Sequence, residues 1–337
     1  MKVFYFFITL LISGICFIFW QHFQLTQDEI VLSKPSPTIF VENNAVISAI
    51  ETDNSLDKNT VALGKRLFFD KQLSADNSIA CVNCHQLNLG GTDQLARSVG
   101  IKGAIGNINA PTVFNSGLNF KQFWDGRAET LEEQVNGPLH SPIEMGSDWK
   151  TVIAKLNRNI EYQTLFANVY NDGITANNIR DAIATFERSL TTPNSRFDKF
   201  LKGDKTALTA LEQSGYQRFK DFGCVSCHQG VNMGGNMFQI FGVMGDYFAD
   251  RGNVTETDWG RYNVTGREED KYFFKVPSLR NVAETPPYFH DGSAQNLDDA
   301  VKVMLKYQLG RVFSDEDIQA LVAFLRTLTG EYNGQAL

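Results

Sequence analysis

The chain has 337 residues, of which 43% are hydrophobic and 20% charged, an ordinary globular composition with enough length for two domains. This balance excludes an intrinsically disordered chain and a collagen-like repeat. The formal net charge is −7, and Lys and Arg are scattered along the sequence, so the basic stripe of a nucleic-acid-binding protein is missing and we expect no nucleic-acid partner.

The first twenty residues predict export from the cytoplasm. Lys2 is followed by an uncharged, mostly apolar run, residues 3–20, which is long for a signal peptide and nearly long enough to span a bilayer. No small-x-small cleavage site closes the run, and its length favours an uncleaved membrane anchor for residues 1–20, with a cleaved signal as the alternative. Residues 21–50, polar and proline-containing in their first part, are expected to form a linker.

Two segments share the spacing Cys-x-x-Cys-His, namely Cys81, Cys84 and His85 in the first, and Cys224, Cys227 and His228 in the second. In this motif two thiols bond to the vinyl groups of a haem, and the adjoining histidine reaches its iron. The alternatives are two disulfides or one zinc site of four thiolates, but zinc does not require a histidine directly after both second cysteines. We therefore expect two covalently bound c-type haems.

The two halves of the chain share further segments, which predicts an internal duplication. Three segments recur at one offset of 166 residues: 111–115 as 277–281, 125–126 as 291–292, and 130–135 as 296–301. Since each half also contains one haem motif, we expect an N-terminal haem domain at 51–200 and a C-terminal haem domain at 201–337.

Helical periodicity is the clearest local signal, taken in chain order. Thr130 and Glu133 form a capping pattern, and apolar residues of 179–190 recur at helical spacing. A second apolar stripe covers 297–305, and Ser314 opens a last helix that runs toward Gly330. Because no run of alternating strand residues is convincing, we predict an all-α fold of two cytochrome c-like haem domains.

The second haem has a candidate sixth ligand. Met304 lies on the apolar face of its predicted helix, 76 residues after His228, and His/Met ligation would give a high reduction potential. A methionine in an apolar stripe is also consistent with ordinary core packing. Met233, Met237 and Met244 are competing ligands that spacing alone does not exclude.

The first haem lacks this ligand, because Pro138 stands at the position that matches Met304 and proline cannot bind iron. An iron with a vacant position can bind and activate a small molecule. Glu144, in the segment that would line the open face, is a candidate general acid-base group, although a surface or capping role is the alternative. His140 is a second candidate for the acid-base role and a candidate ligand of the iron, with a place in a structural turn as the alternative.

Residues from about 63 to 330 resemble the bacterial dihaem cytochrome c peroxidase family, which includes the MauG-like enzymes. Besides both haem motifs, the likeness rests on segments in the same order along the chain: 109–112, 122–128, 137–138, 144–145, 186–190, 274–281 and 287–292. The resemblance implies a periplasmic enzyme, tethered to the inner membrane if the anchor is kept, that reduces hydrogen peroxide with electrons from a small cytochrome c or cupredoxin.

The resemblance also implies residue roles. His85 would be the proximal ligand of a low-potential peroxidatic haem, while His228 and Met304 would ligate a high-potential haem. Catalytic roles fall to Glu144, to Gln134 in the same pocket, and to Trp124 between the haems; a lone tryptophan is otherwise a buried aromatic.

A calcium ion at the domain interface is a further implication of the resemblance, approached by Asn109 and by backbone oxygens of Thr285 and Pro287. Many relatives are homodimers. One departure matters, because Ile101 stands where such peroxidases often carry a removable histidine. We therefore expect the first haem to be open already in the oxidised protein. A MauG-like oxidase that modifies a partner protein, and a plain electron carrier, remain the alternatives.

Overall fold

The computed structural model describes residues 46–52 and 55–337 of the chain. The expected anchor or signal at 1–20 and most of the expected linker at 21–50 lie outside these residues. None of the helices in the described part combines the length and apolar character that crossing a bilayer requires.

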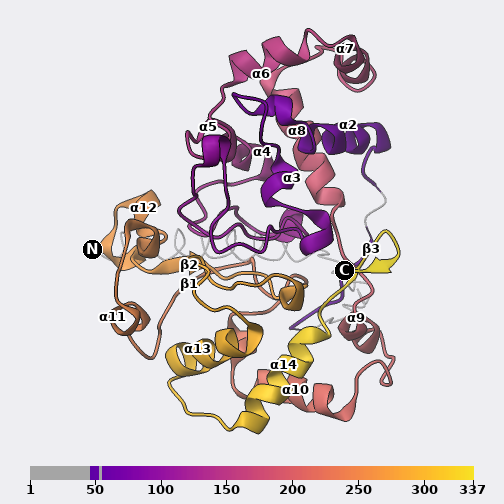
Figure 1. Ribbon diagram of the computed structural model, residues 1–337. Coiled ribbons are helices and arrows are strands. Elements are labelled where there is room, and N and C mark those ends of the chain that lie inside the picture. Colours follow the sequence, from indigo (N-terminus) through magenta and orange to yellow (C-terminus); the bar gives the residue numbers. More distant parts are fainter. Residues whose placement is uncertain (1–45, 53–54) are drawn as a thin grey trace, which may run out of the picture. The chain divides into compact units, whose positions relative to one another are not determined.

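The described chain is mostly helical. The helices of its first half are α2 (Lys58–Phe68), α3 (Cys81–Cys84), α4 (Leu131–Gln134), α5 (Asn136–His140), α6 (Trp149–Leu156), α7 (Ile160–Ala167) and α8 (Ala176–Ser189). Those of the second half are α9 (Arg196–Leu201), α10 (Ala210–Asp221), α11 (Tyr247–Arg251), α12 (Tyr262–Thr265), α13 (Leu297–Leu309) and α14 (Asp315–Arg326). They form two groups, with a short β-ribbon between them (Figure 1).

The all-α prediction is not fully correct, because two short antiparallel pairs interrupt the helices. β1 (Phe238–Ile240) pairs with β2 (Phe273–Lys275), and β3 (Glu331–Tyr332) pairs with β4 (Gln335–Ala336). Strands of two or three residues are too short to leave a recognisable alternation of apolar and polar residues in a sequence.

The helix ends follow the capping signals in the sequence. The side chain of Thr130 accepts a hydrogen bond from the backbone of Glu133 at the start of α4. Ser314 and Asp317 form a reciprocal capping box at the start of α14. The helices predicted over 179–190 and 297–305 are α8 and α13, so these four predictions are confirmed.

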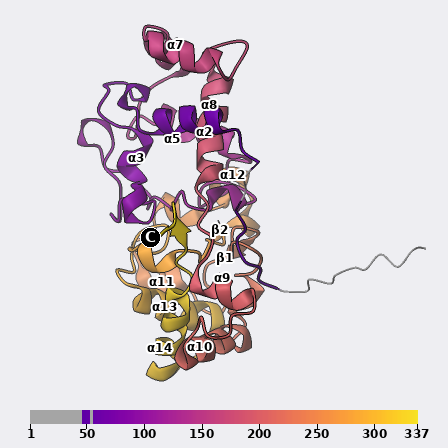
Figure 2. The same ribbon diagram turned by 90° about the vertical axis from the view of Figure 1, so that its right-hand side faces the viewer.

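Each half is organised around a close crossing of two helices, α2 with α8 and α10 with α14 (Figure 2). A Cβ atom on Gly64 would lie 1.8 Å from the carbonyl oxygen of Ala182, and one on Gly215 would lie 1.9 Å from that of Ala320. Only glycine permits this approach. The apolar core of each half lies around its own crossing.

Two pairs of residues separated by the offset of 166 positions share a backbone conformation. Asn115 and Asn281 both adopt left-handed conformations, with φ of 58° and 59°. The side-chain amides of both donate to the Thr192 hydroxyl, at 2.8 and 2.9 Å. Phe123 and Phe289 are likewise left-handed, with φ of 68° and 72°. These matched features support the duplication expected from the sequence.

An aromatic cluster lies beside the β1–β2 ribbon. Its buried members are Tyr247, Phe248, Phe274 and Tyr307, and Trp124 of the first half packs against them. The region between the two helical groups is therefore rich in aromatic side chains.

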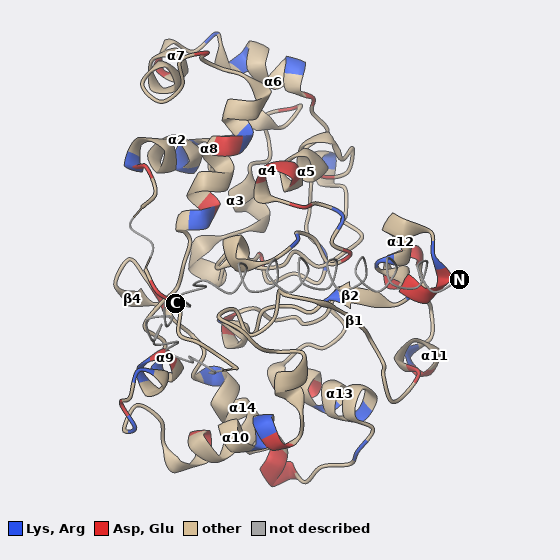
Figure 3. Ribbon diagram, turned by 180° about the vertical axis from the view of Figure 1, so that it is seen from behind, with Lys and Arg blue, Asp and Glu red and all other residues tan. Residues whose placement is uncertain are grey.

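Charges of both signs are distributed over the helices of both halves (Figure 3).

Candidate functional site

The second Cys-x-x-Cys-His segment follows α10 as a tight turn, in which the backbone N–H of His228 donates to the Cys224 carbonyl at 3.0 Å. The imidazole Nδ1 lies 3.2 Å from the Met233 carbonyl oxygen, so Nδ1 carries the proton and donates it. Burial lowers the pKa of His228 to about 4. The ring is therefore neutral at pH 7, and its Nε2 lone pair is free for a metal.

The first Cys-x-x-Cys-His segment has the same arrangement. Helix α3 carries both cysteines, and Nδ1 of His85 lies 3.3 Å from the Gly91 carbonyl oxygen. Burial also lowers the pKa of His85. Both imidazoles thus present Nε2 in the way a proximal haem ligand requires.

The alternatives to haem attachment do not fit the cysteines. The four thiols of the described chain are free, so neither pair forms a disulfide. No cluster of potential metal ligands found in residues 46–52 and 55–337 includes a cysteine, which excludes a four-cysteine zinc site there. Burial raises the pKa of Cys81 to about 12 and that of Cys224 to about 11, whereas zinc requires thiolates.

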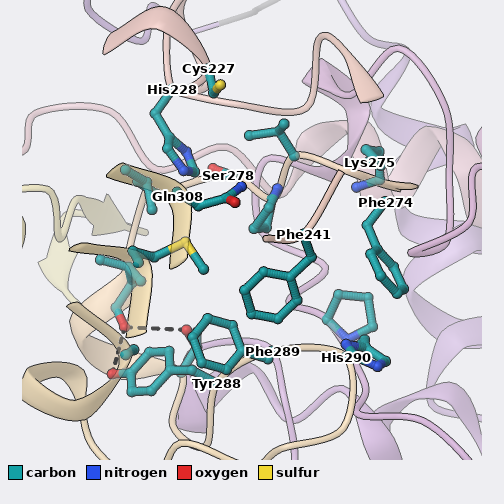
Figure 4. Close-up of a pocket in the computed structure, with 18 of the residues that line it drawn as sticks. Cys227, His228, Phe241, Phe274, Lys275, Ser278, Tyr288, Phe289, His290 and Gln308 are labelled. Atoms are coloured by element: carbon teal, nitrogen blue, oxygen red, sulfur yellow. Dashed lines mark hydrogen bonds between the residues drawn. The ribbon is translucent and has the colours of Figure 1, made fainter. Parts of the chain in front are cut away.

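A cavity of about 540 Å³ begins at the second motif and reaches the first half of the chain. Cys227 and His228 line one part of it, and Phe274, Lys275 and His290 line another (Figure 4). Cys224, Met304 and Trp124 also belong to its lining. The volume lies in the usual range for cofactor pockets. Thiols, a neutral imidazole and a thioether around one mostly apolar cavity fit a c-type haem.

The cavity distinguishes Met304 from its competitors. The side chain of Met233 is fully buried in the core of the second half, and its carbonyl oxygen supports His228 instead. Met244 is 62% exposed, and neither it nor Met237 lines the cavity. Met304, on α13, is the methionine whose side chain shares the cavity with His228.

Glu144 lies close to the first haem motif. Burial raises the pKa of Cys84 to about 11, and the nearby charges of Asp93 and Glu144 add to the shift. Burial also raises the pKa of Glu144 itself, against the opposing charge of Arg127 and a hydrogen bond from Ser141. A half-buried carboxyl with a raised pKa is suited to accept and return a proton.

The other candidates of this region lie in different surroundings. Gln134 ends α4 in a half-buried position, and no hydrogen bond joins it to Glu144. His140 is exposed at the end of α5, with its ring 6.1 Å from that of Trp149. Ile101 is buried, and its backbone N–H donates to the Glu144 carbonyl at 2.9 Å.

Trp124 is held at the junction of the two halves. Its indole N–H donates to the Asn109 carbonyl at 2.9 Å, and its own carbonyl accepts from the backbone of Lys275 at 2.8 Å. Its ring meets that of His290 edge to face, with centroids 6.4 Å apart. These contacts fix the indole beside His290 in the lining of the cavity.

The three residues expected around a calcium ion line the same cavity: Asn109, Thr285 and Pro287. The amide nitrogen of Asn109 donates to the Leu95 carbonyl at 2.9 Å. Its amide oxygen accepts no hydrogen bond from the described residues, so it is free for a cation. An oxygen ligand of this kind suits calcium.

A buried ion network was not expected from the sequence. His290 Nε2 lies 2.7 Å from an Asp258 oxygen, and Arg251 binds both Asp258 and Asp291, at 2.7 and 2.5 Å. The two carboxylates and the imidazole lie close enough together to hold a metal ion. Because the Arg251 guanidinium already supplies the positive charge, a second cation would be repelled.

Two buried ionisable groups were also not predicted from the sequence. Glu187 is 6% exposed, and burial raises its pKa to about 8. Lys275 is 7% exposed and lines the cavity. A charged residue inside the apolar run 273–276 was the available signal for Lys275.

Comparison with known proteins identifies the family of this chain. A family model described as di-haem cytochrome c peroxidase matches residues 58–206. The chain is 50% identical over 290 residues to "Cytochrome c peroxidase Ccp" of Escherichia coli (strain K12), covering 86% of this chain and 62% of that protein. It is 45% identical over 286 residues to "Cytochrome c551 peroxidase" of Nitrosomonas europaea, covering 85% and 83%.

A solved structure has the same fold. The crystal structure of "a MauG-like protein associated with microbial copper homeostasis" matches with a TM-score of 0.74 and 27% identity, over 88% of this chain and 96% of that one. This chain spans about three fifths of the length of the Escherichia coli relative.

Proposed function

Because this chain belongs to the di-haem cytochrome c peroxidase family, as its sequence resemblance indicated, we propose that it reduces hydrogen peroxide to water. The electrons would come from a small cytochrome c or cupredoxin. The observation that carries this proposal is the unequal surroundings of the two haem motifs. Met304 shares the cavity of His228, whereas the matching residue in the first half is Pro138 and the acid-base group Glu144 lies nearby.

In the proposed reaction, Cys81, Cys84 and His85 would hold the first haem, which would supply an iron able to bind and reduce peroxide. Glu144 would take the proton from one oxygen of the peroxide and return it to the other, which leaves as water. Gln134 orients the peroxide from the end of α4.

The second motif serves electron entry in this proposal. His228 and Met304 would both ligate the iron of the second haem, and a thioether ligand favours the reduced state. Trp124 relays electrons toward the first haem, because it lines the cavity and is hydrogen-bonded to Asn109 of the first half and Lys275 of the second.

The proposal also covers the domain organisation, a calcium ion, the cellular location and the oligomeric state. The chain comprises haem domains at 51–200 and 201–337, related by duplication, and the matched backbone of Asn115 and Asn281 supports this. Calcium would bind at the free amide oxygen of Asn109, with backbone oxygens of Thr285 and Pro287. We propose a periplasmic protein that forms homodimers.

Ile101 leads to a testable spectroscopic expectation. Since isoleucine cannot ligate iron, the first haem would be five-coordinate or water-bound in the fully oxidised protein. Electron paramagnetic resonance of the ferric protein should then show a high-spin signal. A spectrum with low-spin ferric haems alone would refute this point.

Steady-state kinetics tests the function. The purified dihaem protein should oxidise a reduced mono-haem cytochrome c rapidly when hydrogen peroxide is added. Absence of donor oxidation, with peroxide still reacting, would favour the MauG-like oxidase instead. Failure of the ferric protein to bind peroxide or cyanide would leave the plain electron carrier, because that function requires both irons to have two protein ligands.

A further inference from the structure

The wall of the cavity contains one lysine side chain. Lys275, the last residue of β2, lines the cavity and is 7% exposed. No Asp, Glu or Arg side chain lines it. The Lys275 ammonium therefore faces a space in which the chain provides no anion.

The ammonium also lacks a partner elsewhere in the described part of the chain. No hydrogen bond or ion pair of Lys275 Nζ to a residue of 46–52 or 55–337 is present, and burial, without an opposing charge, lowers the pKa of Lys275 to about 8. Arg280, which is also buried, shows the usual arrangement. Its guanidinium binds Asp198 at 2.8 Å and the carbonyls of Val231 and Ser48 at 2.9 and 2.8 Å.

The backbone keeps Lys275 at this position. Its N–H donates to the Trp124 carbonyl at 2.8 Å, and the residue pairs with Phe238 across the β-ribbon. In Figure 4 the side chain points into the cavity from the side of Phe274 and His290, not from that of Cys227. An isolated buried cation is costly unless an anion compensates it.

A c-type haem carries such an anion. Its two vinyl groups are bonded to the cysteines, so its two propionate carboxylates extend from the opposite edge of the ring. We propose that the Lys275 ammonium binds a propionate of the haem attached to Cys224 and Cys227. Lys275 is then a positioning residue, which fixes the haem edge next to the Trp124 backbone and stabilises the reduced iron by neutralising a nearby negative charge.

This inference rests on the proposed second haem, but not on peroxide turnover. The test compares the holoproteins K275M, which keeps an unbranched side chain without charge, and K275R, which keeps the charge. K302M is the matched control, because Lys302 is an exposed lysine on α13, the helix that carries Met304. Mass spectrometry and the pyridine haemochrome spectrum establish that each variant carries two haems.

The midpoint potentials of both haems are then measured by spectroelectrochemical titration. We expect K275M to lower the equilibrium constant for reduction of the second haem at least tenfold, a shift of about 59 mV. K275R and K302M should stay near the wild type. Equal potentials of the second haem in K275M and K302M, or a shift confined to the first haem, would overturn the assignment.

A crystal structure of the wild-type holoprotein decides the matter even where K275M fails to mature. The Lys275 Nζ should lie within about 4 Å of a propionate oxygen of the second haem, the limit for an ion pair. A longer separation from both propionates would refute the proposal. Loss of peroxidase activity with both haems and the ion pair intact would instead count against the proposed function alone.

Discussion

Substitution of Glu144 tests the proposed proton transfer most directly. E144Q keeps the size and polarity of the side chain but removes the proton acceptor. A positioned acid-base group contributes about 10²- to 10⁴-fold in rate, so kcat/KM for peroxide should fall by this factor. At about 1.4 kcal/mol per tenfold change, the loss corresponds to about 3–6 kcal/mol of transition-state stabilisation.

The pH dependence of kcat/KM tests the same role of Glu144. Glu144 must be ionised to accept a proton, and burial raises its pKa above the ordinary 4.5. In the wild type, kcat/KM should therefore decline as the pH falls through this raised pKa. Because the charge of Arg127 opposes the shift, R127Q should move the decline to higher pH. Arg127 is 43% exposed, so the move should be less than about one pH unit.

The assay is steady-state peroxide reduction by reduced cytochrome c across the acidic range. E161Q is the matched control, because Glu161 is an exposed carboxylate on α7 whose pair with Arg66 lies at the surface. The reasoning fails if E144Q retains the wild-type kcat/KM, or if the acidic decline is unchanged in E144Q.

Three other substitutions have expected outcomes. M304L should lower the potential of the second haem and remove its ferric thioether-to-iron absorption band, whereas M244L should change neither in a redox titration. Because the pKa of Glu187 is raised from 4.5 to about 8, the folded protein keeps a proton there that the unfolded chain has lost. Stability should thus fall between these pH values by up to about 1.4 kcal/mol per pH unit, and E187Q should abolish this component of the decline in urea midpoints. D198N leaves Arg280 as an unpaired buried charge, so calorimetry should show destabilisation by about 3–5 kcal/mol.

The sequence by itself determined the features that depend on neighbouring residues. The spacing of two cysteines and a histidine defines each haem motif within five positions. Capping patterns such as Ser314 with Asp317 work over three residues, so they set the start of a helix without reference to the rest of the fold. The duplication was predicted because matched segments keep their order along the chain, and the same offset aligns Pro138 with Met304.

Only the tertiary structure decided which residues meet. The sequence left four methionines as candidate ligands of the second haem. In the structure, α13 places Met304 in the cavity with His228. The pairing of His290 with Asp258, and the isolation of the Lys275 ammonium, likewise depend on segments that are distant in sequence. Burial and the charges around a group are properties of the packed chain, because each depends on contacts from several elements at once.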